Sequence, residues 1–109
     1  MKDIKYSLLE LATLRKNGNA SEAISRATNG AKYIDNLGFT RLWLAEHHNM
    51  EFIASSATSV LIGHIASQTK NIRVGSGGIM LPNHSPLVIA EQFGTLETLY
   101  PNRIDLGLG

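Results

Sequence analysis

The chain has 109 residues, of which 43% are hydrophobic and 17% charged, with a formal net charge of +1, a composition typical of a folded globular domain rather than a disordered chain. The basic residues are scattered from Lys2 to Arg103 without a run, so the charge pattern predicts no nucleic-acid partner and no anionic membrane partner. The absence of cysteine excludes disulfides, thiolate catalysis and cysteine metal sites.

The first predicted elements are a strand and a helix. Apolar residues alternate with period two from Ile4 to Leu9, which predicts a strand. Apolar residues then recur at helical spacing, which predicts a helix over about Ala20 to Leu37. Asn19 followed by Glu22 resembles a capping box, and Gly38 is a suitable left-handed stop.

The second half of the chain repeats this alternation twice. The apolar run from Arg41 to Ala45 predicts a strand, and a helical pattern follows from Ala57 to Ile65. A short strand is predicted over Ile72 to Gly75, and Ser85 with Pro86 indicates the start of a helix that continues to Leu99. The last predicted strand covers Arg103 to Leu108.

The predicted order is β-α-β-α-β-α-β within a single domain, residues 1–109. Short connections and continuous apolar strands are typical of an α/β fold with a parallel sheet and right-handed crossovers. Two architectures fit this order, a portion of a (β/α)8 TIM barrel or an open doubly wound sheet. A complete barrel needs about 250 residues, so four strands would form roughly its first half.

The most distinctive polar cluster is Glu46-His47-His48, which follows the second strand at its carboxyl end. Chemistry in parallel α/β folds is carried out at this end of the sheet. Adjacent histidines on a strand point to opposite faces, so no metal site is predicted. The histidines are candidates for a general base or a hydrogen-bond donor, and ordinary loop histidines are the alternative. Glu46 could orient an imidazole, bind a cofactor hydroxyl, or instead pair with Arg41 or Arg73.

Two further histidines have simpler interpretations. His64 lies on the apolar face of its predicted helix, which favours a hydrogen-bonded core or interface residue. His84 directly precedes the helix start at Ser85 and is interpreted as a loop or capping residue that could approach the same sheet edge. Neither is predicted to be a metal ligand.

The segment Gly75-Ser76-Gly77-Gly78 has three glycines at the end of a strand, which permits close approach of the backbone to a flat ligand. The segment lacks the Gly-x-Gly-x-x-Gly spacing of a dinucleotide loop. Ordinary turn chemistry is the alternative interpretation. A small oxidoreductase of the open-sheet type would require a dinucleotide bound here.

Residues 1–14 mix charged and apolar side chains and lack the pattern of a signal peptide. No window approaches the roughly 20 apolar residues that a membrane helix requires. Together with the absence of cysteine, these features favour a cytoplasmic protein with no membrane partner.

Three segments together resemble the bacterial luciferase-like flavin monooxygenases over essentially the whole chain. They are Trp43-Leu44-Ala45-Glu46-His47-His48-Asn49, Val74-Gly75-Ser76-Gly77-Gly78-Ile79-Met80-Leu81-Pro82 and Arg103-Ile104-Asp105-Leu106-Gly107-Leu108-Gly109. The resemblance implies a (β/α)8 barrel that binds reduced FMN at the carboxyl ends of its strands. It also implies the use of dioxygen to oxidise an aldehyde or another small organic substrate, with a deazaflavin as the alternative cofactor in related members.

The resemblance assigns roles to individual residues. His47 matches a catalytic base, His48 its catalytic neighbour, and Glu46 the acid of the flavin site. Gly77 and Gly78, which follow Ser76, match a pair joined by a cis peptide against the flavin ring.

The resemblance also implies a homo-oligomer, formed by the second and third helices near Val60, His64 and Phe93. Leu61 and Leu96 have the same interface interpretation beside a core one. The second half of the barrel is missing from this sequence, so the chain is expected to be truncated and inactive in isolation. The alternative function is a truncated, non-enzymatic half-barrel that self-assembles, because an open half-barrel has uncovered edges.

Overall fold

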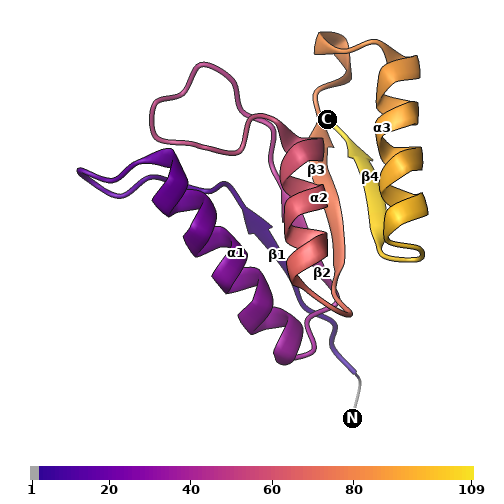
Figure 1. Ribbon diagram of the computed structural model, residues 1–109, viewed down its shortest axis with the longest axis horizontal. Coiled ribbons are helices and arrows are strands. Elements are labelled where there is room, and N and C mark those ends of the chain that lie inside the picture. The colour runs from indigo at the N-terminus through magenta and orange to yellow at the C-terminus, as the bar shows by residue number, and fades with distance from the viewer. Residues whose placement is uncertain (1–2) are drawn as a thin grey trace.

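A computed structural model describes residues 3–109 of the chain. Four parallel strands form one sheet in the order β1-β2-β3-β4, and a helix follows each of the first three strands (Figure 1). The predicted β-α-β-α-β-α-β order and parallel pairing are confirmed. The strands are β1 (Ser7–Glu10), β2 (Arg41–Leu44), β3 (Arg73–Ile79) and β4 (Ile104–Leu108), and the helices are α1 (Ala20–Asn36), α2 (Thr58–Gln68) and α3 (Pro86–Leu99).

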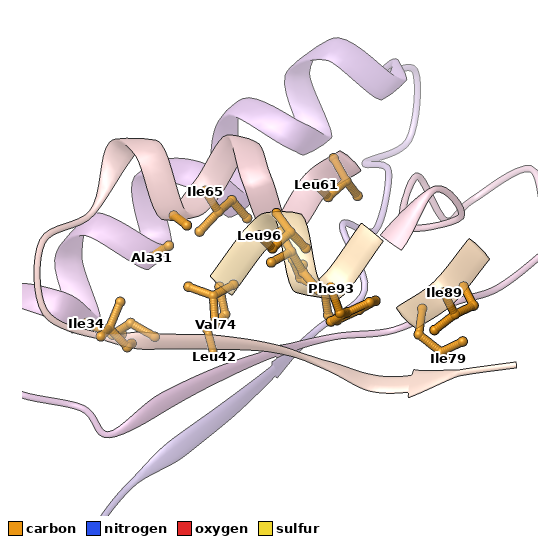
Figure 2. Close-up of a cluster of buried hydrophobic side chains, with 14 residues drawn as sticks. Ala31, Ile34, Leu42, Leu61, Ile65, Val74, Ile79, Ile89, Phe93 and Leu96 are labelled. Carbon is orange, nitrogen blue, oxygen red and sulfur yellow. The ribbon is translucent and has the colours of Figure 1, made fainter. Parts of the chain in front are cut away.

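The three helices lie on one face of the sheet, and the main core fills the space between them and the strands (Figure 2). Leu42, Leu44 and Val74 are fully buried on the strand side. The core cluster has fourteen buried residues, and those from the helices include Ile62, Ile65 and Phe93. The opposite face of the sheet is here called the open face, and Leu9 on the edge strand β1 is an exposed apolar side chain there. Leu108 on the other edge strand, β4, is also exposed, but it pairs with the core residue Ile79 and so lies on the helix side.

Local sequence signals account for the ends of α1. The Asn19 side chain accepts a hydrogen bond from the Glu22 amide at 2.9 Å, as its capping position predicts. The Glu22 carboxylate pairs with Arg26 at 2.9 Å one turn later. Gly38 has φ +81°, so the predicted left-handed stop is confirmed.

The structure differs from the predicted elements at the start of β1, at the end of β3 and in the segment that follows β3. The first strand begins at Ser7 rather than Ile4, because pairing with β2 starts at the register of Ser7 with Arg41. β3 continues to Ile79, four residues past the predicted end, because its glycines stay extended between β2 and β4. A single 3-10 turn, Leu81–Asn83, follows β3 and was not predicted.

The carboxylate of Asp35 fixes the connection from α2 to β3. It accepts hydrogen bonds from the backbone amides of Lys70, Asn71 and Ile72 at 2.7, 3.1 and 2.8 Å. Burial opposes ionisation of Asp35, but these three amides and the nearby Arg103 guanidinium outweigh it and lower the pKa. An acidic side chain from the last turn of α1 therefore sets where β3 enters the sheet.

The residues of α2 and α3 that were predicted to form a subunit interface are only partly exposed. Phe93 is 6% exposed and lies in the core cluster, as do Leu61 and Leu96, so these residues take the core interpretation. His64 is exposed, so its core interpretation is wrong. Val60 is 69% exposed on the outer side of α2. Among residues 3–109, no helix combines the length and apolar character needed to cross a membrane.

Candidate active site at the carboxyl ends of the strands

A pocket of about 350 Å³ lies on the open face at the carboxyl ends of the strands, and we call it the glycine pocket. All four strands contribute to it. Its lining consists of Leu9, Trp43, Ser76, Gly77, Gly78, Gly107 and Leu108. The three predicted residues Ser76, Gly77 and Gly78 are therefore brought together with an apolar wall from the neighbouring strands.

Backbone packing explains why glycines line this pocket. A Cβ atom at Gly78 would lie 2.8 Å from the Leu108 carbonyl carbon and 2.9 Å from the Gly109 nitrogen. The peptide between Gly77 and Gly78 is cis, as the resemblance implies. The pairing of β3 with β4 shifts register between Ser76 and Ile79, where these glycines lie. Two strand backbones therefore approach at the pocket more closely than side chains would allow.

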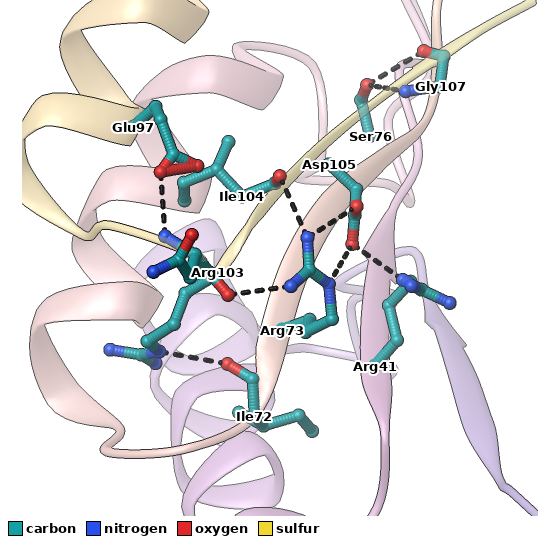
Figure 3. Close-up of polar contacts among 10 residues, drawn as sticks. Arg41, Ile72, Arg73, Ser76, Glu97, Arg103, Ile104, Asp105 and Gly107 are labelled. Atoms are coloured by element: carbon teal, nitrogen blue, oxygen red, sulfur yellow. Dashed lines mark hydrogen bonds and ion pairs between the residues drawn. The ribbon is translucent and has the colours of Figure 1, made fainter.

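Ser76 ties the two strands together below the pocket. Its hydroxyl donates to the Gly107 carbonyl at 2.8 Å and accepts from the Gly107 amide at 3.0 Å (Figure 3). Ser76 is fully buried. Its hydroxyl is satisfied within the sheet, so the pocket wall at Ser76 is rigid.

A charged cluster lies on the same strands nearer their amino ends (Figure 3). Asp105 accepts from Arg41 Nε at 2.6 Å and from Arg73 Nε and Nη2 at 2.9 Å each. The hydrogen bonds from Arg73 are the main cause of a lowered Asp105 pKa. Burial acts in the opposite direction, and the hydrogen bond from Arg41 lowers the pKa further. Arg41 and Arg73 are thus paired with Asp105, and the predicted alternative that Glu46 pairs with either arginine is wrong.

Glu46 instead joins two histidines from different loops. Its side chain is 1% exposed, and its carboxylate accepts from His48 Nε2 at 2.7 Å and from His84 Nε2 at 3.0 Å. The Met80 amide approaches the same carboxylate at 3.4 Å. Burial raises the Glu46 pKa, but the His48 and His84 hydrogen bonds and the Met80 amide outweigh it, so the pKa is lowered. The carboxylate stays ionised and holds both imidazoles.

His47 points elsewhere. It lines a second pocket of about 290 Å³ with five residues of the β2–α2 loop, which are Asn49, Met50, Glu51, Ile53 and Ser56. Its backbone amide donates to the Ser55 carbonyl at 2.9 Å, and the chain turns at Asn49, where φ is +56°. The adjacent histidines are separated, but both follow the end of β2 at Leu44, so the loop and not strand geometry sets their directions. The lining of the glycine pocket does not include His47.

Two residues extend the predicted site. His84, a loop or capping residue that could approach this edge, does approach it, and its imidazole contacts Glu46. Trp43, which the residue pattern predicts only as part of the strand Arg41 to Ala45, forms a wall of the glycine pocket. The sequence does contain a signal for this position. Trp43 is two residues from Arg41 in the same strand, and alternate residues of a strand share a face.

The profile of the luciferase-like monooxygenases matches residues 4–109. The chain belongs to the luciferase-like monooxygenase family. A luciferase-like monooxygenase of Escherichia coli (strain K12) is 61% identical over 108 residues, which are 99% of this chain and 32% of that protein. The N-acetyl-S-alkylcysteine monooxygenase of Bacillus subtilis (strain 168) is 41% identical over 97% of this chain and 32% of its own length. This luciferase-like chain therefore spans about a third of the length of the curated relatives it matches.

Solved structures place the luciferase-like chain within a larger barrel fold. The crystal structure of apo-MsnO8 matches 98% of this chain and 32% of its own with a TM-score of 0.95 and 44% identity. The oxygenating constituent of 3,6-diketocamphane monooxygenase from Pseudomonas putida, solved in complex with FMN, matches 98% of this chain and 29% of its own with a TM-score of 0.90 and 24% identity. An F420-dependent secondary alcohol dehydrogenase matches 97% of this chain and 32% of its own with a TM-score of 0.70 and 21% identity. The α/β fold of a TIM-barrel portion is confirmed, and the open-sheet alternative is wrong.

Proposed function

We propose that this chain carries part of the active site of a flavin-dependent monooxygenase that uses reduced FMN and dioxygen to oxidise a small organic substrate. The observation that carries the proposal is the glycine pocket, which all four strands form at the end of the sheet where barrel enzymes do their chemistry. Family membership supports the reaction class. FMN is bound in a structure of the same fold, and the F420-dependent dehydrogenase makes a deazaflavin the alternative cofactor.

The residues of the glycine pocket fit the flat ring of a flavin. The cavity of about 350 Å³ is mostly apolar, and at Gly77 and Gly78 the lining is backbone without side chains. A planar ring can therefore approach the backbone closely. Ser76, Gly77 and Gly78 would hold the ring, which supplies the redox chemistry with dioxygen when bound.

The polar groups that follow β2 have distinct proposed roles. His47 is the proposed base, because its imidazole is half-buried at the rim of a cavity and Glu46 does not hold it. His48 is the second proposed catalytic residue, and the Glu46 carboxylate fixes its imidazole at 2.7 Å. The resemblance makes Glu46 the flavin-site acid. Because its carboxylate is already bound by two imidazoles, we propose that Glu46 acts on the flavin site by positioning His48 and His84.

A titration of the chain with photoreduced FMN under anaerobic conditions tests this function. We expect saturable binding. We also propose that a flavin in the glycine pocket extends to the β2–α2 loop and accepts a hydrogen bond from His47, so His47→Ala should weaken binding about tenfold, which corresponds to the loss of about 1.4 kcal/mol. Isothermal titration calorimetry measures both dissociation constants. The control is His64→Ala, which removes an exposed histidine on the outer side of α2 and should leave FMN binding unchanged. Absence of binding up to millimolar FMN would contradict the proposal, and a parallel titration with F420 distinguishes the deazaflavin alternative.

We further propose that the protein is cytoplasmic, which its cysteine-free sequence supports. We also propose that it forms a homo-oligomer, which a groove on the outer side of the helices supports. A groove of about 410 Å³ runs between α2 and α3, and exposed apolar groups of Val60 and Val88 contribute to its lining. Burying such a patch against a second copy removes apolar surface from water. Light scattering at micromolar concentrations should show a dimer, and Val60→Asp should shift it to monomer. A monomer for the unchanged chain would contradict the interface.

The alternative function is a non-enzymatic half-barrel that self-assembles. The observation that favours it is the pair of sheet edges, where Leu9 on β1 and Leu108 on β4 are more than half exposed. In that case His47→Ala would change no property beyond local packing, and the FMN titration would show no saturable binding.

A further inference from the structure

The indole of Trp43, the only tryptophan of the sequence, occupies space that three glycines leave free on the open face. A Cβ atom at Gly75 would lie 2.9 Å from Trp43 Cζ3, and one at Gly77 would lie 2.9 Å from Trp43 Cβ and 3.3 Å from Cγ. At Gly107 the corresponding distance to Cζ3 is 3.5 Å. The indole therefore lies across β3 toward β4, and any side chain at Gly75 or Gly77 would displace it.

Two different environments meet at this indole. Trp43 pairs with Gly75 across β2 and β3, and Gly75 pairs with Asp105, so Trp43 and Asp105 lie in one row of the sheet. The paired Arg41 and Arg73 lie two residues before that row. The Arg41 guanidinium, held by Asp105 at 2.6 Å, lies 5.0 Å from the centre of the Trp43 ring. This cation–π contact fixes the ring from the amino-terminal side. On the carboxyl-terminal side, the same ring lines the glycine pocket.

We propose that Trp43 is a ligand-contacting residue that forms the floor of the glycine pocket and sets how deeply a planar ring enters it. The inference rests on the proposed function, because it takes the ligand to be the flavin ring. An indole is a large apolar surface with few rotatable bonds, so it offers contact at a small entropic cost. It also separates the ring from the charges of Arg41, Arg73 and Asp105. Glycine at 77 is then required by the indole as well as by the ligand, whereas glycine at 75 is required by the indole and by the close approach of Asp105.

A single fluorine label tests the contact directly, because 5-fluorotryptophan incorporated at Trp43 gives one 19F resonance. Photoreduced FMN is added anaerobically to the labelled 109-residue chain while calorimetry measures its binding in parallel. Contact with the flavin ring is expected to move the resonance by more than its linewidth, in proportion to the calorimetric saturation. Binding by calorimetry with an unmoved resonance would overturn the inference and leave the proposed function standing. No calorimetric binding would refute the proposed function, and the inference with it.

Substitutions give a second measurement. Trp43→Leu is expected to weaken FMN binding about tenfold, whereas Trp43→Phe, which keeps an aromatic floor, should stay within about threefold of the unchanged chain. Phe52→Leu is the matched control, because it removes an exposed aromatic ring of the β2–α2 loop that is 67% exposed. Circular dichroism establishes that each variant is folded. A folded Trp43→Leu variant with unchanged affinity would overturn the inference, and if that variant does not fold, the 19F result decides.

Discussion

Replacing Gly107 with alanine is expected to lower the free energy of unfolding by about 3 kcal/mol, because the added methyl group would collide with the carbonyl oxygen of Ser76. That oxygen belongs to the backbone of β3, and Ser76 is fully buried and bonded to Gly107 through its hydroxyl. Neither partner can rotate away as a surface side chain would. The strands β3 and β4 must separate, and the glycine pocket between them would widen. Urea unfolding followed by circular dichroism measures the loss.

Gly94→Ala is the matched control for this substitution. Gly94 lies in α3, and a Cβ atom there meets nothing within 4 Å. Alanine is favoured over glycine inside a helix by about 1 kcal/mol, so the control should be slightly stabilised. Equal stability of the two variants would show that close backbone approach at Gly107 is not what the sheet requires.

Asp105→Asn is expected to lower the free energy of unfolding by about 2 kcal/mol at neutral pH, because two guanidinium groups would lose their shared carboxylate. The side chains of Asp105, Arg41 and Arg73 are 23%, 27% and 34% exposed, so the expected loss is smaller than for a fully buried ion pair. Asparagine keeps the volume of the side chain. The change therefore reports charge and hydrogen bonding rather than packing.

The same variant has a pH signature. The hydrogen bonds from Arg73, opposed by burial and assisted by Arg41, lower the pKa of Asp105 in the folded chain. A carboxyl group with a lowered folded pKa contributes stability above its unfolded pKa and loses it as the pH falls through the folded value. Stability of the unchanged chain should therefore drop below about pH 4, and the drop should be shallower for Asp105→Asn. Asp3→Asn, at an exposed position near the amino terminus, is the control and should leave the pH profile unchanged.

Local signals in the sequence were sufficient for most of the fold. Asn19 caps the start of α1 and Gly38 follows its end, as their residue types predict. Both signals are local, because each depends only on residues within one helical turn. The extent of β3 could not be predicted in this way. Glycines are poor strand formers on their own, and Gly75 and Gly77 stay extended because β2 and β4 flank them and Trp43 covers them.

The candidate site was harder to predict, because its contacts join residues far apart in the chain. The strand-end argument found Glu46, His47 and His48 as a cluster, but it could not show that His84 would reach Glu46 from a loop after β3. The period-two argument does not apply to His47 and His48, because β2 ends at Leu44 and both histidines lie in the following loop. It could not tell which of the two would be held by the carboxylate, because that depends on the turn at Asn49.

The strand order β1-β2-β3-β4 has a consequence for how the chain is made. Each strand pairs with a partner roughly thirty residues further along the sequence, so every added unit closes a loop of similar length at a similar entropic cost. Among the four described strands, none pairs with a segment more than one strand–helix unit away. Synthesis at about 5–20 residues per second would deliver one complete strand–helix unit every few seconds, and each could dock on the edge of the sheet already formed. We therefore expect these four strands to assemble in the order in which they are translated.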